Sequence, residues 1–410
     1  MNSTALVIFL LTYVLASTRG LERWGLERPT VALLGALACV LFGVLDPTQA
    51  LASIDGSTLL LLFGMMGLGA FLALDGFFDH VESRLVQLAR TPSRLLAWIV
   101  FGAGVTSALV TNDAVCVLGA PVVVRLIRRH QLPPLPFLLA LATSANTGSV
   151  ATLVGNPQNM LCASLGHLNY LDHLLVFLPL AAVCLLINFA FLRWAFRAAL
   201  ARARLELSEA APLPLASSSK TTLFVIVGTA LAYSLGGHLA WTAVGAFGLL
   251  IVLQRRLTRD LWAHVDWSLL LFFGGLFVVV RGFDASGVPD WLFRHFPLLG
   301  TARADSLAAF ARLSTLFLVG SNIVSNVPFI LVIEKQMLTL PDPRWGWELL
   351  AMASTFAGNL TLLGSVANVI VAEAGREVGG IGFVDYAKIG APLALLTTAL
   401  GTLWIHCIAG

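Results

Sequence analysis

Amides, hydroxyls, glycines and prolines interrupt otherwise apolar sequence at four places. Two interruptions are short, at 111–113 and 325–328, and two are long, at 143–159 and 354–368. Gly and Pro end a helix, and the resulting half-helices offer unpaired N–H groups, free carbonyls and partial charges. Asn and Thr side chains can both donate and accept hydrogen bonds. We therefore expect the four breaks to converge on a binding site for a small polar solute.

The predicted solute-binding residues all belong to these breaks. They are Thr111, Asn112, Asn146, Thr147, Gly148, Thr152, Gly155, Asn156, Pro157 and Asn159 in the first half of the chain, and Ser325, Asn326, Asn359, Thr361, Gly364, Ser365 and Asn368 in the second. An isolated Ser or Thr in a membrane helix more often joins helices to one another, with Gly allowing close packing. Because the breaks occur in pairs, one of each kind per half, we favour a binding function.

Asp113 is the most distinctive residue in the breaks, because it is a carboxylate within an apolar run from 95 to 126. An ionisable group at membrane depth is costly and marks ion or proton pathways. We predict that Asp113 binds the ion that couples to transport, either a proton or a Na⁺ held near Asn112, Asp113 and Asn156. The alternative is an N-cap for the half-helix that follows. The corresponding position in the second half is Val327, so coupling chemistry should concentrate in the first half. No cofactor other than this ion is expected, and no metal site besides it.

The composition indicates that lipid is the solvent of this chain. Of its 410 residues, 58% are apolar and only 11% are charged, and the mean hydropathy is +0.87. Soluble domains carry about 25% charged residues. Continuous apolar runs approach the length of about 20 residues that spans a bilayer as a helix; they occur at 31–45, 57–74, 173–191, 221–235, 240–253, 267–280 and 391–408. The runs do not alternate as barrel strands do, so we predict an all-α, multi-pass protein of the cell (inner) membrane.

An internal repeat relates the two halves. Three segments recur in the same order, with 55–64 resembling 266–275, 110–112 resembling 324–326, and 152–159 resembling 361–368. The offsets are 211, 214 and 209 residues, and the last pair reads T-x-x-G-x-x-x-N in both halves. Three matches at a nearly constant offset indicate a duplication.

The distribution of Lys and Arg predicts the topology, because these residues favour cytoplasmic loops. Basic clusters occur at 19–28, 84–94, 125–129, 193–220 and 255–259. Two of them flank the break at 111–113, so the segment between them should enter and leave on the cytoplasmic side. Each half then has an odd number of crossings and one hairpin, which inverts the second half. We predict about ten transmembrane helices, two re-entrant hairpins and both termini outside.

The expected domain organisation follows from this topology. The first repeat, 1–192, contains a hairpin at 95–126 and a broken helix at 135–165. A cytoplasmic linker rich in Arg, Pro and Ser covers 193–220. The second, inverted repeat, 221–410, contains a hairpin at 305–335 and a broken helix at 348–373. Asp75, Asp79, Arg281 and Asp284 lie near the ends of predicted spans, where we expect solvent at the membrane interface.

At its breaks the sequence resembles the ion transporter superfamily, in its arsenite permease, P protein and citrate-transporter-like branch. Segments 111–113, 144–159, 325–328 and 357–368 carry the resemblance, which extends over nearly the whole chain. It implies an elevator-type transporter with scaffold and transport domains in each repeat, often a homodimer. The two hairpin tips correspond to the Ser-Asn-Thr motifs of the related dicarboxylate–sodium symporters. Here they read Thr-Asn-Asp and Ser-Asn-Val, which argues against dicarboxylate transport with two sodium ions.

The charge inventory of the breaks bears on the substrate. None of the four contains Lys or Arg, so only helix N-termini could compensate the two charges of a dicarboxylate. A neutral oxyacid such as arsenous acid needs hydrogen bonds alone. We therefore predict proton-coupled export of a small inorganic oxyacid or anion of the arsenite or antimonite type. Sodium-coupled citrate or dicarboxylate transport and Na⁺/H⁺ antiport are the alternatives.

Sequence motifs of other functions are missing from the chain. There is no G-x-x-x-x-G-K nucleotide loop and no G-x-S-x-G nucleophile elbow, so we expect neither an enzyme nor ATP hydrolysis within this chain. The expected partners are the lipid bilayer, the small polar or ionic solute and a second copy of the chain, with room for a separate ATPase subunit. Nucleic acid is not an expected partner.

Overall fold

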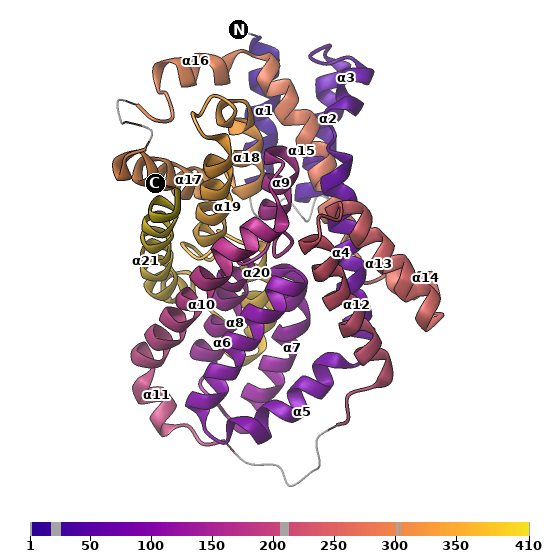
Figure 1. Ribbon diagram of the computed structural model, residues 1–410, viewed down its shortest axis with the longest axis vertical. Coiled ribbons are helices and arrows are strands. Elements are labelled where there is room, and N and C mark those ends of the chain that lie inside the picture. Colours follow the sequence, from indigo (N-terminus) through magenta and orange to yellow (C-terminus); the bar gives the residue numbers. More distant parts are fainter. Residues whose placement is uncertain (1, 18–25, 206–212, 301–302, 304, 410) are drawn as a thin grey trace.

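The computed structural model describes residues 2–17, 26–205, 213–300, 303 and 305–409. These residues form helices and connecting turns, and none of them forms a strand (Figure 1). The predicted all-α class is confirmed for this part of the chain. Arg19 and Arg23 of the first basic cluster, and 206–212 of the predicted linker, lie outside the described residues.

The helices divide into two series of similar order. In the first half they are α1 (Ser3–Ser17), α2 (Arg28–Leu41), α3 (Pro47–Ala52), α4 (Gly56–Leu74), α5 (Phe77–Ala89), α6 (Pro92–Leu109), α7 (Asn112–His130), α8 (Pro134–Ser149), α9 (Pro157–Gly166), α10 (Tyr170–Ala195) and α11 (Arg197–Arg202). In the second half they are α12 (Ser217–Ser234), α13 (Leu239–Gln254), α14 (Thr258–Trp262), α15 (Trp267–Ala285), α16 (Val288–His295), α17 (Leu307–Val324), α18 (Asn326–Met337), α19 (Pro343–Ala357), α20 (Val366–Ala374), a 3-10 turn (Gly375–Val378) and α21 (Phe383–Ala409).

Several helices are suited to a bilayer. Among the described residues, six helices are long and apolar enough to cross a membrane, namely α4, α6, α10, α15, α17 and α21, and α1, α2 and α13 are apolar but shorter. α10 also exposes a continuous apolar face, with Leu175, Leu178 and Leu186 each more than half exposed. Such a face is stable next to lipid tails and unfavourable in water. The chain is therefore a multi-pass membrane protein, while the count of ten crossings stays a prediction.

All four sequence breaks coincide with helix ends. Thr111 separates α6 from α7, and Ser325, with a φ of 76°, separates α17 from α18. Residues 150–156 join α8 to α9, and 358–365 join α19 to α20. A side-chain cap from Thr111 or Asn156 begins the next helix, as expected for Thr and Asn before a helix. The helices extend up to a few residues beyond the predicted bounds, most of all at Pro343, except that α17 begins at Leu307, inside the predicted start at 305.

The predicted linker, 193–220, includes helical segments. α10 continues to Ala195, α11 covers Arg197–Arg202, and α12 begins at Ser217. Arg, Ala and Leu are good helix formers, so a basic segment of this composition need not end the helix. The part of the linker that is both described and non-helical is limited to 203–205 and 213–216.

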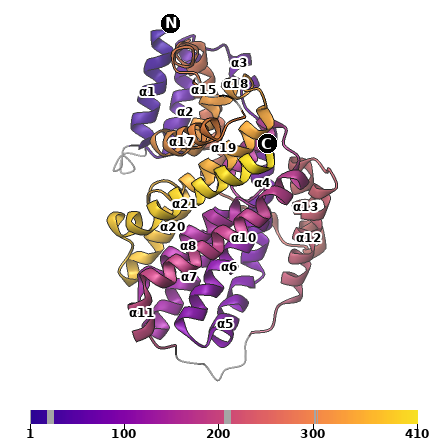
Figure 2. The ribbon, with the colours of Figure 1, turned by 60° about the vertical axis from the view of Figure 1, so that its left-hand side comes forward.

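Equivalent helices of the two halves exchange contacts across the molecule. α4 packs on α13, and α2 packs on α15. A side chain at Gly64 on α4 would place its Cβ 2.6 Å from the methyl carbon of Ala243, and one at Gly275 on α15 would lie 3.0 Å from that of Ala32. Both pairs are related by the 211-residue offset of the repeat. Figure 2 shows the two clusters apart, with α1, α2 and α15 together and α12 beside α13.

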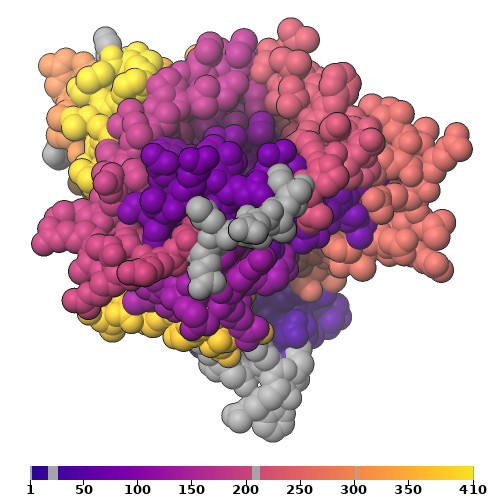
Figure 3. Space-filling view, turned by 90° about the horizontal axis from the view of Figure 1, so that it is seen from below, coloured from indigo at the N-terminus to yellow at the C-terminus, as the bar shows by residue number. Residues whose placement is uncertain are grey.

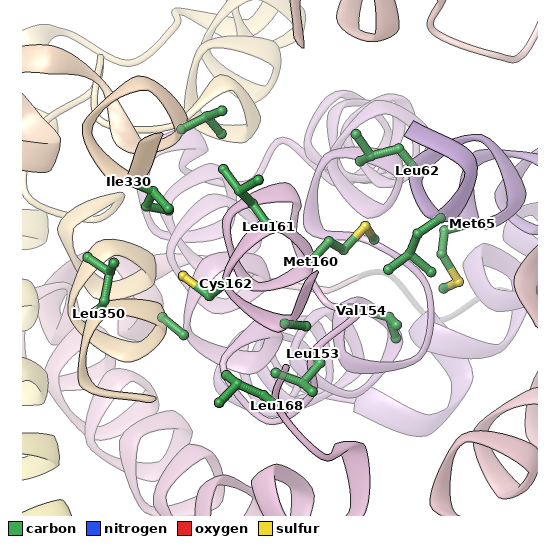
Figure 4. Packing of buried hydrophobic residues seen from close by; sticks show 14 of the residues in the cluster. Leu62, Met65, Leu153, Val154, Met160, Leu161, Cys162, Leu168, Ile330 and Leu350 are labelled. Carbon is green, nitrogen blue, oxygen red and sulfur yellow. The ribbon is translucent and has the colours of Figure 1, made fainter. Parts of the chain in front are cut away.

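α9 packs between helices of the two halves. α9 contacts α4 on one side and α18 and α19 on the other. Figure 4 shows Met160 of α9 on the side of Leu62 and Met65, and Cys162 on the side of Leu350. In the view from below, segments around α5–α7 occupy the centre, with parts of the second half on both sides (Figure 3). The two halves are thus interleaved, and α9 contacts helices of both halves.

Candidate functional site

The tip of the first hairpin, where α6 meets α7, is hydrogen-bonded to α8 and to the break that follows it. The backbone N–H of Asn112 donates to the carbonyl of Gly155 at 2.8 Å. Its side-chain Nδ2 donates to Oδ1 of Asn146 at 2.9 Å. Thr111 Oγ1 accepts from the N–H of Ala114 at 3.3 Å and so caps α7. These contacts bring together the predicted site residues of the breaks at 111–113 and 143–159.

The second half repeats this arrangement at its own tip. Asn326 Nδ2 donates to the carbonyl of Gly364 at 3.2 Å, and Asn326 and Gly364 are the repeat equivalents of Asn112 and Gly155. Ser325 precedes α18 with a positive φ of 76°, which is unfavourable for a residue with a side chain. Each tip is therefore bound to a glycine carbonyl in the break of its own half.

The T-x-x-G-x-x-x-N motif has the same geometry in both halves. Asn159 Nδ2 donates to the carbonyls of Ser149 (3.2 Å) and Thr152 (3.0 Å). Asn368 Nδ2 donates to those of Gly358 (2.6 Å) and Thr361 (3.2 Å). In each case the amide folds back to the carbonyls ten and seven residues earlier. The Asn thus satisfies carbonyls left free where the first half-helix ends.

A cluster of amides and hydroxyls joins the two halves at the centre. Asn146 Nδ2 donates to Oδ1 of Asn359 (3.0 Å) and of Asn368 (2.9 Å). Ser365 Oγ donates to Asn146 Oδ1 at 3.1 Å, and Asn359 Nδ2 donates to Thr147 Oγ1 at 3.1 Å. All these side chains are buried. The structure therefore places Asn146, Thr147, Asn359, Ser365 and Asn368 in one network.

Thr355 belongs to the same centre, although the predicted site omits it. Its hydroxyl donates to Asn159 Oδ1 at 2.9 Å and accepts from Asn156 Nδ2 at 3.0 Å. Thr355 is the repeat equivalent of Asn146, which makes the corresponding contacts in the other direction. The repeat offset applied to Asn146 was the sequence signal that could have found it.

Other predicted site residues have packing or bracing contacts. Gly148 lies against the backbone of Gly104, with no room for a side chain. Thr152 Oγ1 donates to the carbonyl of Ala108 at 2.7 Å, and Thr361 Oγ1 donates to Asn322 Oδ1 at 3.3 Å. These contacts fix the breaks against α6 and α17, so a solute would meet the helix ends rather than these hydroxyls.

Asp113 faces a cavity of about 330 Å³. The walls come from α4, α7, the segment before α15, and the beginnings of α9 and α20, including Pro157. His264 and Asp266 are its other ionisable lining residues. Because the wall is otherwise largely apolar, Asp113 and these two residues dominate the chemistry of the cavity.

The carboxylate of Asp113 also lies at the start of α20. It lies near the backbone N–H of Ala367, in the first turn of that helix. Helix N-termini carry a partial positive charge and bind anions. Asp113, from the first half, therefore occupies the anion position of a half-helix from the second half.

A family model described as "Citrate transporter" (CitMHS) matches residues 13–357. The chain belongs to this citrate transporter family. It is 31% identical over 471 residues to the silicon efflux transporter LSI3 of Oryza sativa subsp. japonica, covering 98% of this chain and 96% of the relative. It is 25% identical over 482 residues to the Dictyostelium discoideum protein named "Putative transporter arsB", covering 90% and 85%.

A solved structure has a similar fold. The YdaH transporter of Alcanivorax borkumensis matches with a TM-score of 0.55 at 16% identity, over 100% of this chain and 97% of that one. The resemblance to arsenite-permease and citrate-transporter-like proteins is thereby confirmed, and the chain is a membrane transporter of this family. Its named relatives are transporters, which implies a transport role.

This CitMHS family member has a second cavity, of about 1040 Å³. Its lining includes 52–55, which the repeat relates to 263–266 beside Asp113. Asp284, expected to be solvated, has a side chain only 12% exposed and pairs with Lys335 at 3.1 Å. Asp284 is thus paired and less exposed than expected, although it also lines this cavity. The two cavities thus differ: one carries an acid at its hairpin tip, and the other carries ion pairs away from the tip.

Asp75 is also misplaced by the sequence prediction. Its side chain is fully buried and bonds to Arg256 Nη2 (2.7 Å), Thr222 Oγ1 (2.5 Å) and Gln254 Nε2 (3.0 Å). These partners belong to the second half of the chain and are distant in sequence. The position of Asp75 at the end of an apolar run therefore suggested exposure at the membrane surface, and nothing in the sequence indicated its buried partners. Asp79, in contrast, is 65% exposed and pairs with Arg125.

Proposed function

We propose that this family member is a secondary transporter that exports a small inorganic oxyacid or anion in exchange for protons, with Asp113 as the proton-binding group. The position of Asp113 carries the proposal, since the residue faces a cavity and lies beside the start of a half-helix of the opposite repeat. An intramembrane carboxylate in that position suits a proton pathway.

Proton and solute would compete for Asp113. A neutral oxyacid presents O–H groups, and an ionised carboxylate accepts hydrogen bonds from them. Protonation removes that charge and one acceptor position, so a proton weakens solute binding and solute weakens proton binding. Such mutual exclusion is what exchange of one for the other requires.

The proposed cargo agrees with the surroundings of Asp113. The four breaks contribute amides and hydroxyls but neither Lys nor Arg, and Asp113 already neutralises the start of α20. A second anion of high charge would be repelled there. Similarity to relatives named for silicon efflux and arsB supports an oxyacid cargo.

We further infer that the halves, 1–192 and 221–410, are inverted repeats around a linker at 193–220 and work by an elevator motion. The exchanged pairs α4–α13 and α2–α15, and the matched folding of Asn159 and Asn368, support the repeat. The hairpins and broken helices would form the moving part, and the cavity of Asp113 lies where that part meets α4 and α15. The proposed assembly is a homodimer in the cell (inner) membrane, with room for a separate ATPase subunit.

Sodium-coupled transport of citrate or another dicarboxylate is the second candidate, because the family model is described as a citrate transporter. Na⁺ would then bind near Asn112, Asp113 and Asn156. Oxygen atoms from such residues suit a hard cation. Na⁺/H⁺ antiport would use the same carboxylate without another solute.

Transport into everted membrane vesicles separates these candidates. We expect uptake of arsenite or silicic acid driven by an imposed pH gradient, and loss of that dependence in Asp113→Asn with residual exchange of the solute. Asp385→Asn, an exposed carboxylate on α21, is the matched control and should behave as the unmodified protein. Citrate uptake that strictly requires Na⁺, or wild-type pH dependence in Asp113→Asn, would overturn the proposal.

A further inference from the structure

A histidine and a glutamate from different halves are buried against each other. His173 of α10 and Glu348 of α19 have side chains 0% and 2% exposed, and His173 Nδ1 lies 2.5 Å from Glu348 Oε2. The imidazole also stacks on Phe177, with ring centroids 4.4 Å apart. Burying an ionisable pair costs free energy, and in a membrane helix such a pair indicates a functional role rather than a structural one.

The hydrogen bonds of His173 define how many protons the pair holds. Nε2 lies 3.0 Å from the carbonyl of Val150, and a carbonyl only accepts, so Nε2 carries a hydrogen. One further proton then lies between Nδ1 and Glu348. It makes either an imidazolium with a carboxylate or an imidazole with a carboxylic acid, and both forms are neutral overall. Loss of that proton leaves a buried carboxylate facing a lone pair.

Few ionisable groups face this pair. The Cys162 thiol of α9 is near Glu348, and α8 contains no ionisable side chain. On the adjoining helices, Asp172 pairs with Arg344, Lys335 with Asp284 and Lys388 with Asp385, and Arg312 donates to the carbonyl of Leu298. Tyr386 and His406 of α21 and Glu334 of α18 are further ionisable residues on these helices, and none of these three is hydrogen-bonded to His173 or Glu348. No cation in this set contacts Glu348, so His173 alone balances its charge.

Both partners are connected to the break between α8 and α9. Val150, which accepts from His173, is the first residue after α8. Thr355 lies seven residues after Glu348, on the same face of α19 and about 10 Å away along the helix axis. Thr355 in turn bonds Asn156 and Asn159. The pair is therefore connected to the break on two sides, through Val150 and through Thr355.

We propose that His173 and Glu348 form a second proton-binding site of the transporter, separate from Asp113, whose occupancy sets the geometry of the break between α8 and α9. The inference goes beyond the proposed function, because it depends neither on the cargo nor on Asp113. It predicts two groups that exchange protons independently.

Infrared difference spectroscopy of the purified protein in liposomes, between acid and alkaline pH, tests the site without any cargo. We expect a carboxyl signal that disappears in Glu348→Gln and persists in Asp113→Asn. Asp172→Asn, the adjacent exposed carboxylate on α10 (48% exposed), is the matched control and should retain it. An identical spectrum in Glu348→Gln would overturn the proposal.

Transport distinguishes a proton site from a structural clamp. The amide introduced by Glu348→Gln can still donate to His173 Nδ1, so a clamp predicts an unchanged pH profile of arsenite exchange. A proton site predicts that the ratio of rates at acid and neutral pH moves toward one. Where Glu348→Gln does not accumulate in the membrane, Glu348→Asp keeps a titratable group at shorter reach. Its infrared signal must shift, and an unshifted signal counts against the site.

Discussion

Replacing Asn159 with Ala tests whether the paired amides hold the two breaks. The wild-type side chain is fully buried and makes three hydrogen bonds, two from Nδ2 to the carbonyls of Ser149 and Thr152 and one from Thr355 to Oδ1. A buried hydrogen bond contributes about 1 kcal/mol net, and the loss grows when partners are left unpaired. We therefore expect Asn159→Ala to lower the free energy of unfolding by about 3 kcal/mol.

The repeat supplies a second, independent value for the same quantity. Asn368 also makes three such bonds, to the carbonyls of Gly358 and Thr361 and from Asn146. Asn368→Ala should therefore cost as much as Asn159→Ala, again about 3 kcal/mol. Asn169→Ala is the control, since that exposed residue makes a single cap bond to the N–H of Asp172 and should cost about 1 kcal/mol.

Unfolding of the purified variants in mixed detergent micelles, titrated with a denaturing detergent, gives these free energies. The reasoning is refuted if either buried variant loses no more than the cap control. It is also refuted if the two buried variants differ by as much as about 2 kcal/mol, because equal bonding then would not produce equal stability.

Two further changes probe the framework around the site. Asp75→Ala leaves Arg256, Thr222 and Gln254 without their buried partner, and we expect a loss of about 3–5 kcal/mol in the same unfolding titration; a loss below about 1 kcal/mol would mean that the pair behaves as a surface pair. Gly64→Ala should cost about 1–3 kcal/mol by overpacking against Ala243. Gly245→Ala, with open space at its Cβ position, should be neutral, and equal effects of the two would show that α4 and α13 are not packed as described.

The positions of the breaks could be predicted from sequence, because their causes are local. Thr before α7, Pro at the start of α9 and Gly near the ends of helices act on the backbone within a few residues. The repeat then related each break in one half to one in the other. The same reasoning could not foresee that Asn159 and Asn368 turn back to earlier carbonyls, because a side-chain direction is set by the folded loop.

Charged pairs between distant segments could not be predicted from the sequence. Asp75 and Arg256 are separated by 181 residues, and His173 and Glu348 by 175. No periodicity or spacing links such residues, and each alone resembles an ordinary polar residue at the end of an apolar run. Their pairing depends on how the two halves interleave, which is a property of the whole fold.

The central amide cluster has a consequence for work across a pH gradient. Asn146, Asn359, Asn368, Ser365 and Thr355 are neither acids nor bases in the physiological range, so their mutual hydrogen bonds have the same strength on either side of the membrane. The hydrogen bonds within this cluster therefore do not respond directly to the acidity of the solution on either side of the membrane. Under the two proposals above, the pH dependence of transport resides in Asp113 and in the pair of His173 and Glu348, so substitutions at these few positions would change it while the amides and hydroxyls stay the same.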